Sequence, residues 1–124
     1  MNDFYYRTML KRKRFMPIYS GSLMKGFITF YITNNIDKYV NSDPYVPLPD
    51  DSQGKILYIA QLFTDKKSVN PKMSYRVWRD FKNFIKNEFP LVETICWRRW
   101  DRKSKGVKTY SRRIQSETAK NIKK

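Results

Sequence analysis

The sequence contains no histidine, a single cysteine (Cys96) and only four glycines among its 124 residues. Without histidine, the protein cannot use a Ser-His-Asp or Cys-His mechanism, and it lacks the commonest general base and a frequent metal ligand. A single cysteine excludes an internal disulfide and a cysteine-rich zinc site. Neither GxGxxG nor GxxxxGK[ST] occurs, so the common glycine loops for nucleotides are absent. Most familiar catalytic sites are therefore excluded.

Few residues remain that are suited to catalysis or metal binding. Cys96 lies near Arg98 and Arg99, which would lower the pKa of a nucleophilic thiol, but its apolar surroundings in the sequence favour a small buried core residue. Asp50 and Asp51 offer the oxygen ligands that divalent cations prefer. Adjacent acids beside prolines are more typical of a solvated loop, which is our interpretation here. We expect no catalytic residue, no metal and no cofactor.

Long hydrophobic runs are also missing. No run approaches the roughly 20 apolar residues that cross a bilayer, and the first ten residues, which include Asp3 and Arg7, do not resemble a signal peptide. We therefore expect a location inside the cell (the host cytoplasm) or in a virion interior. A chain of 124 residues with 40% hydrophobic and 16% aromatic residues suits one folded domain.

Four segments have the composition of strands, because β-branched and aromatic residues fill them. The predicted strands are 27–33, 55–64, 92–100 and 107–112.

One segment has the pattern of an amphipathic helix. Apolar residues recur at three- and four-residue spacing over 74–89, at Val77, Trp78, Phe81, Ile85 and Phe89. Pro71 or Ser74 would begin this helix and Pro90 would end it. A strand, helix and strand in succession predict a right-handed crossover. We expect an α/β (α+β) fold with a mixed central sheet over 25–113, a basic N-terminal arm over 1–24 and a polar basic tail over 114–124.

The charge is strongly unbalanced, with 26 Lys and Arg against 11 Asp and Glu, a formal net charge of +15. Such an excess destabilises a compact chain by self-repulsion, and a negatively charged partner removes that cost. Nucleic acid is the first expectation, because each neutralised phosphate releases counterions. An acidic protein, an anionic membrane surface or a role in solubility are the alternatives.

The cations cluster near the two ends of the chain. If 92–112 forms a hairpin, its cations line a β-ribbon that suits a phosphate backbone, and Trp97, Trp100 and Tyr110 interleave with them for stacking on unpaired bases. The alternative is that Ile95 and Trp97 face the core while the cations only solvate the outer face. We expect one continuous surface, with phosphate contacts and little base recognition. The predicted nucleic-acid-binding residues are Lys11, Arg12, Lys13, Arg14, Arg98, Arg99, Arg102, Lys103, Lys105, Lys108, Arg112 and Arg113.

Three segments together resemble the GCN5-related N-acetyltransferase fold, especially the toxin-activating lysine acyltransferases and small phage-encoded proteins with that scaffold. They are GFITFYITNNIDKYV, SQGKILYIAQLFT and the helix ending EFP followed by LVETICWRR, within roughly 25–113. The resemblance implies a glycine-rich turn after the central strand that binds acyl-coenzyme A, but 65–71 contains no glycine. The toxin activators use a histidine and an aspartate, whereas this chain has no histidine and has Ala60 at the strand position in question. The resemblance therefore implies the scaffold without the activity.

Three hypotheses for function follow. The preferred one is a small, phage-encoded, non-catalytic virion or accessory protein that binds nucleic acid largely independently of sequence. The second is an N-acyltransferase that uses acyl-coenzyme A at an atypical site, with Tyr58, Tyr110 or a water as acid or base. The third is an adaptor or inhibitor whose basic face docks on an acidic protein.

Overall fold

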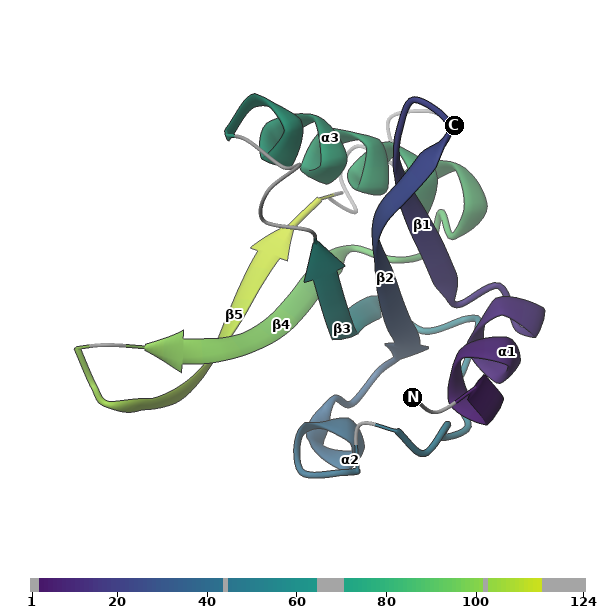
Figure 1. Ribbon diagram of the computed structural model, residues 1–124. Coiled ribbons are helices and arrows are strands. Elements are labelled where there is room, and N and C mark those ends of the chain that lie inside the picture. Colours follow the sequence, from purple (N-terminus) through teal and green to yellow (C-terminus); the bar gives the residue numbers. More distant parts are fainter. Residues whose placement is uncertain (1–2, 44, 65–70, 102, 115–124) are drawn as a thin grey trace, which may run out of the picture.

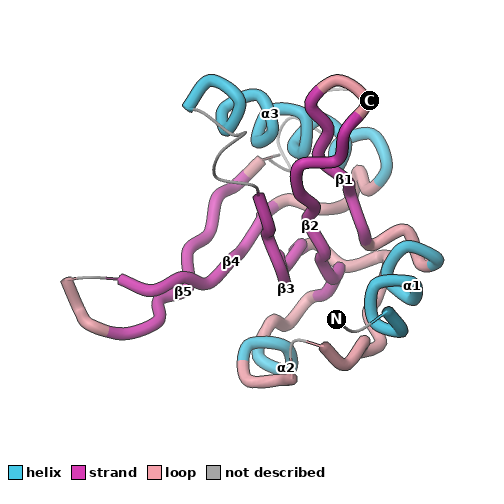
Figure 2. The backbone as a smooth tube through the Cα atoms, viewed as in Figure 1, coloured by secondary structure: helices cyan, strands magenta, loops and turns pink. Residues whose placement is uncertain are grey.

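The computed structural model describes residues 3–43, 45–64, 71–101 and 103–114. They form one five-stranded sheet with helices on both faces (Figure 1, Figure 2). The strand order is β1-β2-β3-β4-β5, and all neighbours are antiparallel except β3 and β4, which are parallel. The elements are α1 (Asp3–Lys11), β1 (Phe15–Ser20), β2 (Leu23–Thr33), α2 (Asp37–Val40), β3 (Ile56–Thr64), α3 (Pro71–Glu88), β4 (Thr94–Asp101) and β5 (Gly106–Arg113).

The predicted α+β fold with a mixed central sheet is confirmed. Each predicted strand is present, with its bounds shifted by a few residues, and α3 begins at Pro71, one of the two predicted starts. The predicted apolar stripe of this helix packs on one face of the sheet: Phe81 and Ile85 are fully buried, and neighbouring apolar side chains of α3 pack around them. The strand-helix-strand crossover therefore joins the parallel pair β3 and β4.

The N-terminal segment 1–24 is part of the domain rather than a separate arm. Its described residues form α1 and β1, and Tyr5 and Met9 are fully buried against the face of the sheet opposite α3. Pro17 lies in β1, which is an edge strand where a missing N–H group is tolerated. The prediction of an arm is wrong. Pro17 and the preceding cations are not typical of a strand, but pairing with β2 stabilises a strand there.

The sheet divides between β3 and β4. These strands pair only at residues 56–58 and 94–96, whereas β2 and β3 remain paired from Thr33↔Ile56 to Gly26↔Thr64. A Cβ atom at Gly26 would clash with the carbonyl oxygen of Phe63, so glycine permits this close approach at the far end of β3. Beyond residue 58, β3 continues beside β2 while β4 continues as a two-stranded ribbon with β5 (Figure 1).

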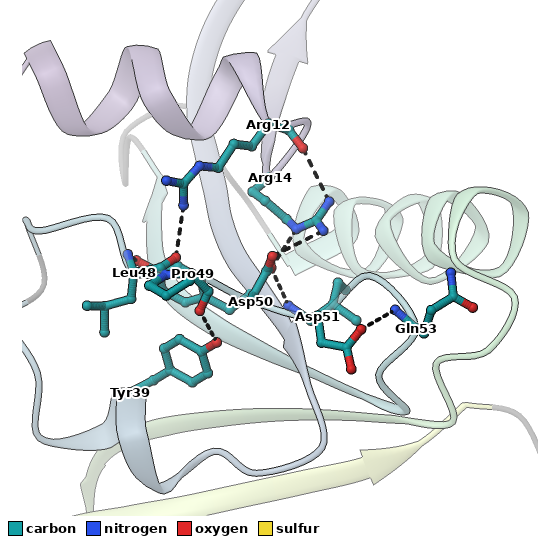
Figure 3. A network of polar contacts seen from close by, with 10 residues as sticks. Arg12, Arg14, Tyr39, Leu48, Pro49, Asp50, Asp51 and Gln53 are labelled. Atoms are coloured by element: carbon teal, nitrogen blue, oxygen red, sulfur yellow. Dashed lines mark hydrogen bonds and ion pairs between the residues drawn. The ribbon is translucent and has the colours of Figure 1, made fainter.

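A buried ion pair joins the end of the α1–β1 connection to the loop before β3 (Figure 3). Arg14 Nε donates to Asp50 Oδ2 at 2.7 Å, and the same oxygen accepts the backbone N–H of Ile32 at 2.8 Å. The guanidinium also lies 5.0 Å from the ring centre of Phe89. Arg14 is therefore an internal residue and is removed from the predicted phosphate-binding set. Likewise, Asp50 is not in a solvated loop, because its side chain is only 10% exposed.

Replacing Arg14 with alanine should lower the free energy of unfolding by about 3–5 kcal/mol, because the Asp50 carboxylate would stay buried without its cation. The exposed Lys11, at the end of α1, is a control that removes the same charge, and Lys11→Ala should cost about 1 kcal/mol or less. Urea unfolding followed by circular dichroism measures both. Equal stability of the two variants would contradict a structural role for the Arg14–Asp50 pair.

Candidate functional site

The ribbon of β4 and β5 extends away from the body of the protein, to the left in Figure 1 and Figure 2. Its strands stay paired from Thr94↔Arg113 to Asp101↔Gly106. Directly opposite residues of antiparallel strands share a face, and successive residues alternate between faces. The ribbon therefore presents two different surfaces, one continuous with the α3 side of the sheet and one with the α1 side.

On the α3 side, the base of the ribbon is held by aromatic packing. The Trp97 ring packs edge to face on Trp78 of α3 with ring centroids 5.7 Å apart, and it stacks on Tyr110 of β5 at 6.0 Å. The guanidinium of Arg99 lies 4.8 Å from the ring centre of Tyr110. Trp97 packs on the core and Ile95 is fully buried. The interpretation that Ile95 and Trp97 face the core is confirmed. The stacked rings of Trp97 and Tyr110 also position the guanidinium of Arg99.

The outer part of the ribbon carries a run of exposed cations. Arg102 and the side chain of Trp100 lie outside the described residues. Arg113 forms an ion pair with Glu93, with its Nη2 atom 3.7 Å from Glu93 Oε1. The exposed cations of the ribbon are Arg99, Lys103, Lys105, Lys108, Arg112 and Arg113.

Two of these cations, Arg99 and Lys108, lie directly opposite each other on neighbouring strands. Like charges in that position destabilise a β-ladder. The ribbon thus brings two exposed cations side by side on the face that continues the α3 side of the sheet.

Arg98 is on the other face of the ribbon and is half-buried. Its Nη1 donates to the carbonyl oxygen of Val40 in α2 at 2.8 Å. Its Nε is fully buried and has no hydrogen-bond partner within the described part of the chain. The predicted binding residue Arg98 thus fastens the ribbon to α2, so we do not count it among the exposed cations.

The basic cluster near the N-terminus lies at the edge of the sheet opposite the ribbon. Lys11, Arg12 and Lys13 are exposed beside β1, and Arg12 donates to the carbonyl oxygen of Leu48 at 2.9 Å (Figure 3). Because β1 and β5 are the two opposite edges of the sheet, these cations and the ribbon do not form one surface. The prediction of a continuous basic face is wrong, and the ribbon alone is the candidate nucleic-acid interface.

A cavity of about 230 Å³ lies on the α1 side of the sheet. Burial raises the pKa of the Tyr58 phenol, and the nearby Arg98 guanidinium offsets part of that rise. The phenol therefore stays protonated at neutral pH and can donate a proton or a hydrogen bond. Among the described residues of the lining the one carboxylate is that of Asp43, which is exposed and accepts the N–H of Tyr45 at 2.9 Å. The lining residues are Tyr31, Tyr39, Val40, Ser42, Asp43, Tyr58 and Ala60.

Neither a metal-ligand cluster nor a membrane-spanning helix occurs in the described ranges. No three His, Cys, Asp or Glu side chains there come together as metal ligands. None of the helices described there has the length and apolar character needed to cross a bilayer.

Cys96 is buried on the α1 side of the sheet among tyrosines, with 7% of its surface exposed. Burial raises the pKa of its thiol. At a given pH the thiolate fraction is therefore smaller than that of a free cysteine, and the thiolate is the reactive form. The interpretation of Cys96 as a core residue is confirmed.

The Cys96 thiol should accordingly react slowly with Ellman's reagent at pH 8 in the native protein, and rapidly once urea unfolds the chain. The raised pKa and the burial both act in this direction. The absorbance of the released thiolate measures the rate, and the unfolded protein is the internal control. A native rate close to the unfolded rate would overturn the assignment of Cys96 to the core.

Comparisons with known proteins agree with the architecture. No protein-family profile matches the sequence, and no curated protein is significantly similar to it. The fold is similar to the crystal structure of the loading GNATL domain of CurA from Lyngbya majuscula, with a TM-score of 0.61 and 15% sequence identity. The match covers 82% of this chain and 51% of that chain, so this protein spans about half the length of the structure it resembles. At this identity the likeness shows the fold, which is that of a GCN5-related N-acetyltransferase-like domain.

Proposed function

We propose that this protein binds nucleic acid through the β4–β5 ribbon, with contacts to phosphates and little dependence on sequence. The observation that carries the proposal is the run of exposed cations, among them the opposed residues Arg99 and Lys108, on a ribbon that no third strand of the described residues covers beyond Cys96. The acyltransferase-like body holds the ribbon at its base. In keeping with the sequence resemblance, the proposal extends to a phage virion or accessory protein without catalytic activity.

The chemistry of the ribbon supports phosphate contacts over base recognition. A two-stranded β-ribbon can lie along a groove or a phosphate backbone. Residues 94–113 contain eight cations and one acid, and they include no Asn or Gln, the side chains that pair with adenine through two hydrogen bonds. Neutralised phosphates release counterions, so the binding depends strongly on salt.

Replacing both Arg99 and Lys108 with alanine should weaken binding to all duplex sequences alike. If each cation contacts one phosphate, the slope of log K against log salt should fall in magnitude by roughly 1.8, since each contact contributes about 0.9. Because the two charges oppose each other across the ribbon, the double variant should keep its fold. Fluorescence anisotropy over a series of salt concentrations measures the slope.

The matched control replaces two exposed cations of α3, Arg76 and Lys86, with alanine. It removes the same charge from a different element, so the slope should stay near that of the unmodified protein. Equal losses in both double variants would show that overall charge, and not the ribbon, drives the binding. An affinity that does not change between low and high salt would remove the proposal altogether.

A second candidate function is supported by the cavity on the α1 side of the sheet. The cavity is lined by Tyr58, which lies at the point where β3 and β4 separate. The fold around it is that of a GCN5-related N-acetyltransferase-like domain. We propose as the alternative that acyl-coenzyme A binds between the separating strands. As an amine attacks the thioester and the C–S bond breaks, the Tyr58 phenol would donate its proton to the leaving thiolate and regain one from the acylated nitrogen by way of solvent. The 18 residues of α3 would cover the α3 side of such a site.

Acetyl-coenzyme A separates the two functions. If the alternative holds, acetyl-coenzyme A at 100 times its Kd should stabilise the protein by about 2.7 kcal/mol, visible as a rise in Tm. The Tyr58→Phe variant should show the same rise in Tm but a lower rate of acetyl transfer. Free coenzyme A is the control ligand, and mass spectrometry of amine acceptors measures transfer. No thermal shift together with no acetylated product would eliminate the acyltransferase alternative.

A further inference from the structure

Three phenylalanine rings form a stack across the first three strands on the α1 side of the sheet. Phe15 of β1 stacks on Phe27 of β2 with ring centroids 5.2 Å apart and planes 17° apart. Phe27 in turn stacks on Phe63 of β3 at 5.6 Å and 27°. Tyr6 of α1 packs with its edge against Phe27 at 5.2 Å. The stack therefore runs along the direction in which the strands are hydrogen-bonded, and α1 covers its middle.

The stack ends at Phe63, where no further strand of the described residues lies beside β3. β4 separates from β3 after Tyr58, five residues before Phe63, so no neighbouring strand continues the row. Among the described residues, Phe27 provides the only aromatic contact to the Phe63 ring, and 54% of Phe63 is exposed. The ring is thus held by the stack on one side, and no aromatic side chain of the described residues contacts it on the other.

We propose that Phe63 is a stacking platform for an unpaired base of a single-stranded nucleic acid. This inference rests on the proposed function and narrows its substrate class from nucleic acid in general to single strands. Every base has a flat π-face that suits an aromatic ring, and such stacking is tolerant of sequence. A base on Phe63 would extend the existing row of parallel rings by one.

The position of Phe63 relative to the ribbon also favours a single strand. Phe63 and Arg99 lie five and three residues beyond the last paired residues of β3 and β4. At a rise of about 3.3 Å per residue, their Cα atoms are no more than roughly 31 Å apart. Arg99 lies on the α3 side of the sheet and Phe63 on the α1 side, so a flexible strand would turn from one face to the other where β3 and β4 separate, contacting the ribbon and placing a base on the ring. In a duplex the bases are already stacked on one another and are not available to Phe63.

Charge distinguishes this occupant from a second copy of the chain. The exposed ring could in principle pack against another copy, but two molecules with a net charge of +15 each repel one another. A polyanion is attracted by the same charge. We therefore assign the open face of Phe63 to a base and treat self-association as an outcome that the experiment tests.

The experiment compares Phe63→Ala with the unmodified protein on a single strand of about 20 nucleotides, longer than the roughly 4–16 that one single-strand-binding fold covers. The same sequence as a duplex is measured in parallel. Phe63→Ala should weaken single-strand binding by roughly 5- to 150-fold and leave duplex binding unchanged. Phe63→Trp should retain the affinity, and Phe63→Leu, which keeps an apolar side chain but no π-face, should behave as alanine does.

Leu62→Ala is the matched control. Leu62 is the neighbouring residue of β3, is 60% exposed and points to the opposite face of the sheet, so its removal should not alter single-strand binding. Circular dichroism of each variant checks the fold. A single strand carrying 2-aminopurine adds a direct readout, because its fluorescence should fall on binding to the unmodified protein and less on binding to Phe63→Leu.

The outcomes separate this inference from the proposed function. If the unmodified protein binds neither single strands nor duplex, the proposed function fails and the inference fails with it. If binding depends on Arg99 and Lys108 but Phe63→Ala and Phe63→Leu bind single strands as well as the unmodified protein, only the inference is overturned. A dimer that becomes a monomer in Phe63→Ala, with unchanged single-strand affinity, overturns it in favour of self-association.

Discussion

The separation of β3 from β4 after residues 58 and 96 is the constraint on which the rest of the structure depends. It divides the sheet into a three-stranded body and a two-stranded ribbon. The same separation leaves Phe63 with no described strand beside it on the side away from Phe27, and it places Tyr58 beside a cavity. Close pairing of β2 with the whole length of β3, which Gly26 permits, keeps β3 on the body while β4 departs.

Two neighbouring residues of β4 hold the ribbon to the body from opposite sides. Trp97 packs on Trp78 of α3, and Arg98 donates a hydrogen bond to Val40 of α2. Alternation of side chains along a strand makes this possible with consecutive residues. The base of the ribbon is therefore fixed to both layers, while its outer cations project from the body. A charged partner can contact the outer part without disturbing the core.

Local composition and periodicity in the sequence predicted the helices and strands they specify. The sequence did not predict features that depend on contacts between distant residues. The β-branched and aromatic residues of 27–33 and the apolar stripe around Phe81 correctly predicted a strand and a helix. The run of cations before Phe15 looked uniform in the sequence, yet Arg14 is buried because it pairs with Asp50, 36 residues away. The order of strands in the sheet, which places the two basic clusters at opposite edges, follows from no local pattern. The ring stack that ends at Phe63 depends on cross-strand register and was missed for the same reason.

Amide chemical-shift mapping tests the ribbon most directly, because it locates the bound partner without any substitution. A titration of isotope-labelled protein with a single-stranded oligonucleotide should shift the amide signals of β4 beyond Trp97 and of β5 most strongly. The amides of Lys11 and Lys13, equally basic but at the opposite edge of the sheet, should shift little. Shifts centred on that opposite edge or on α3, with the ribbon unchanged, would contradict the account.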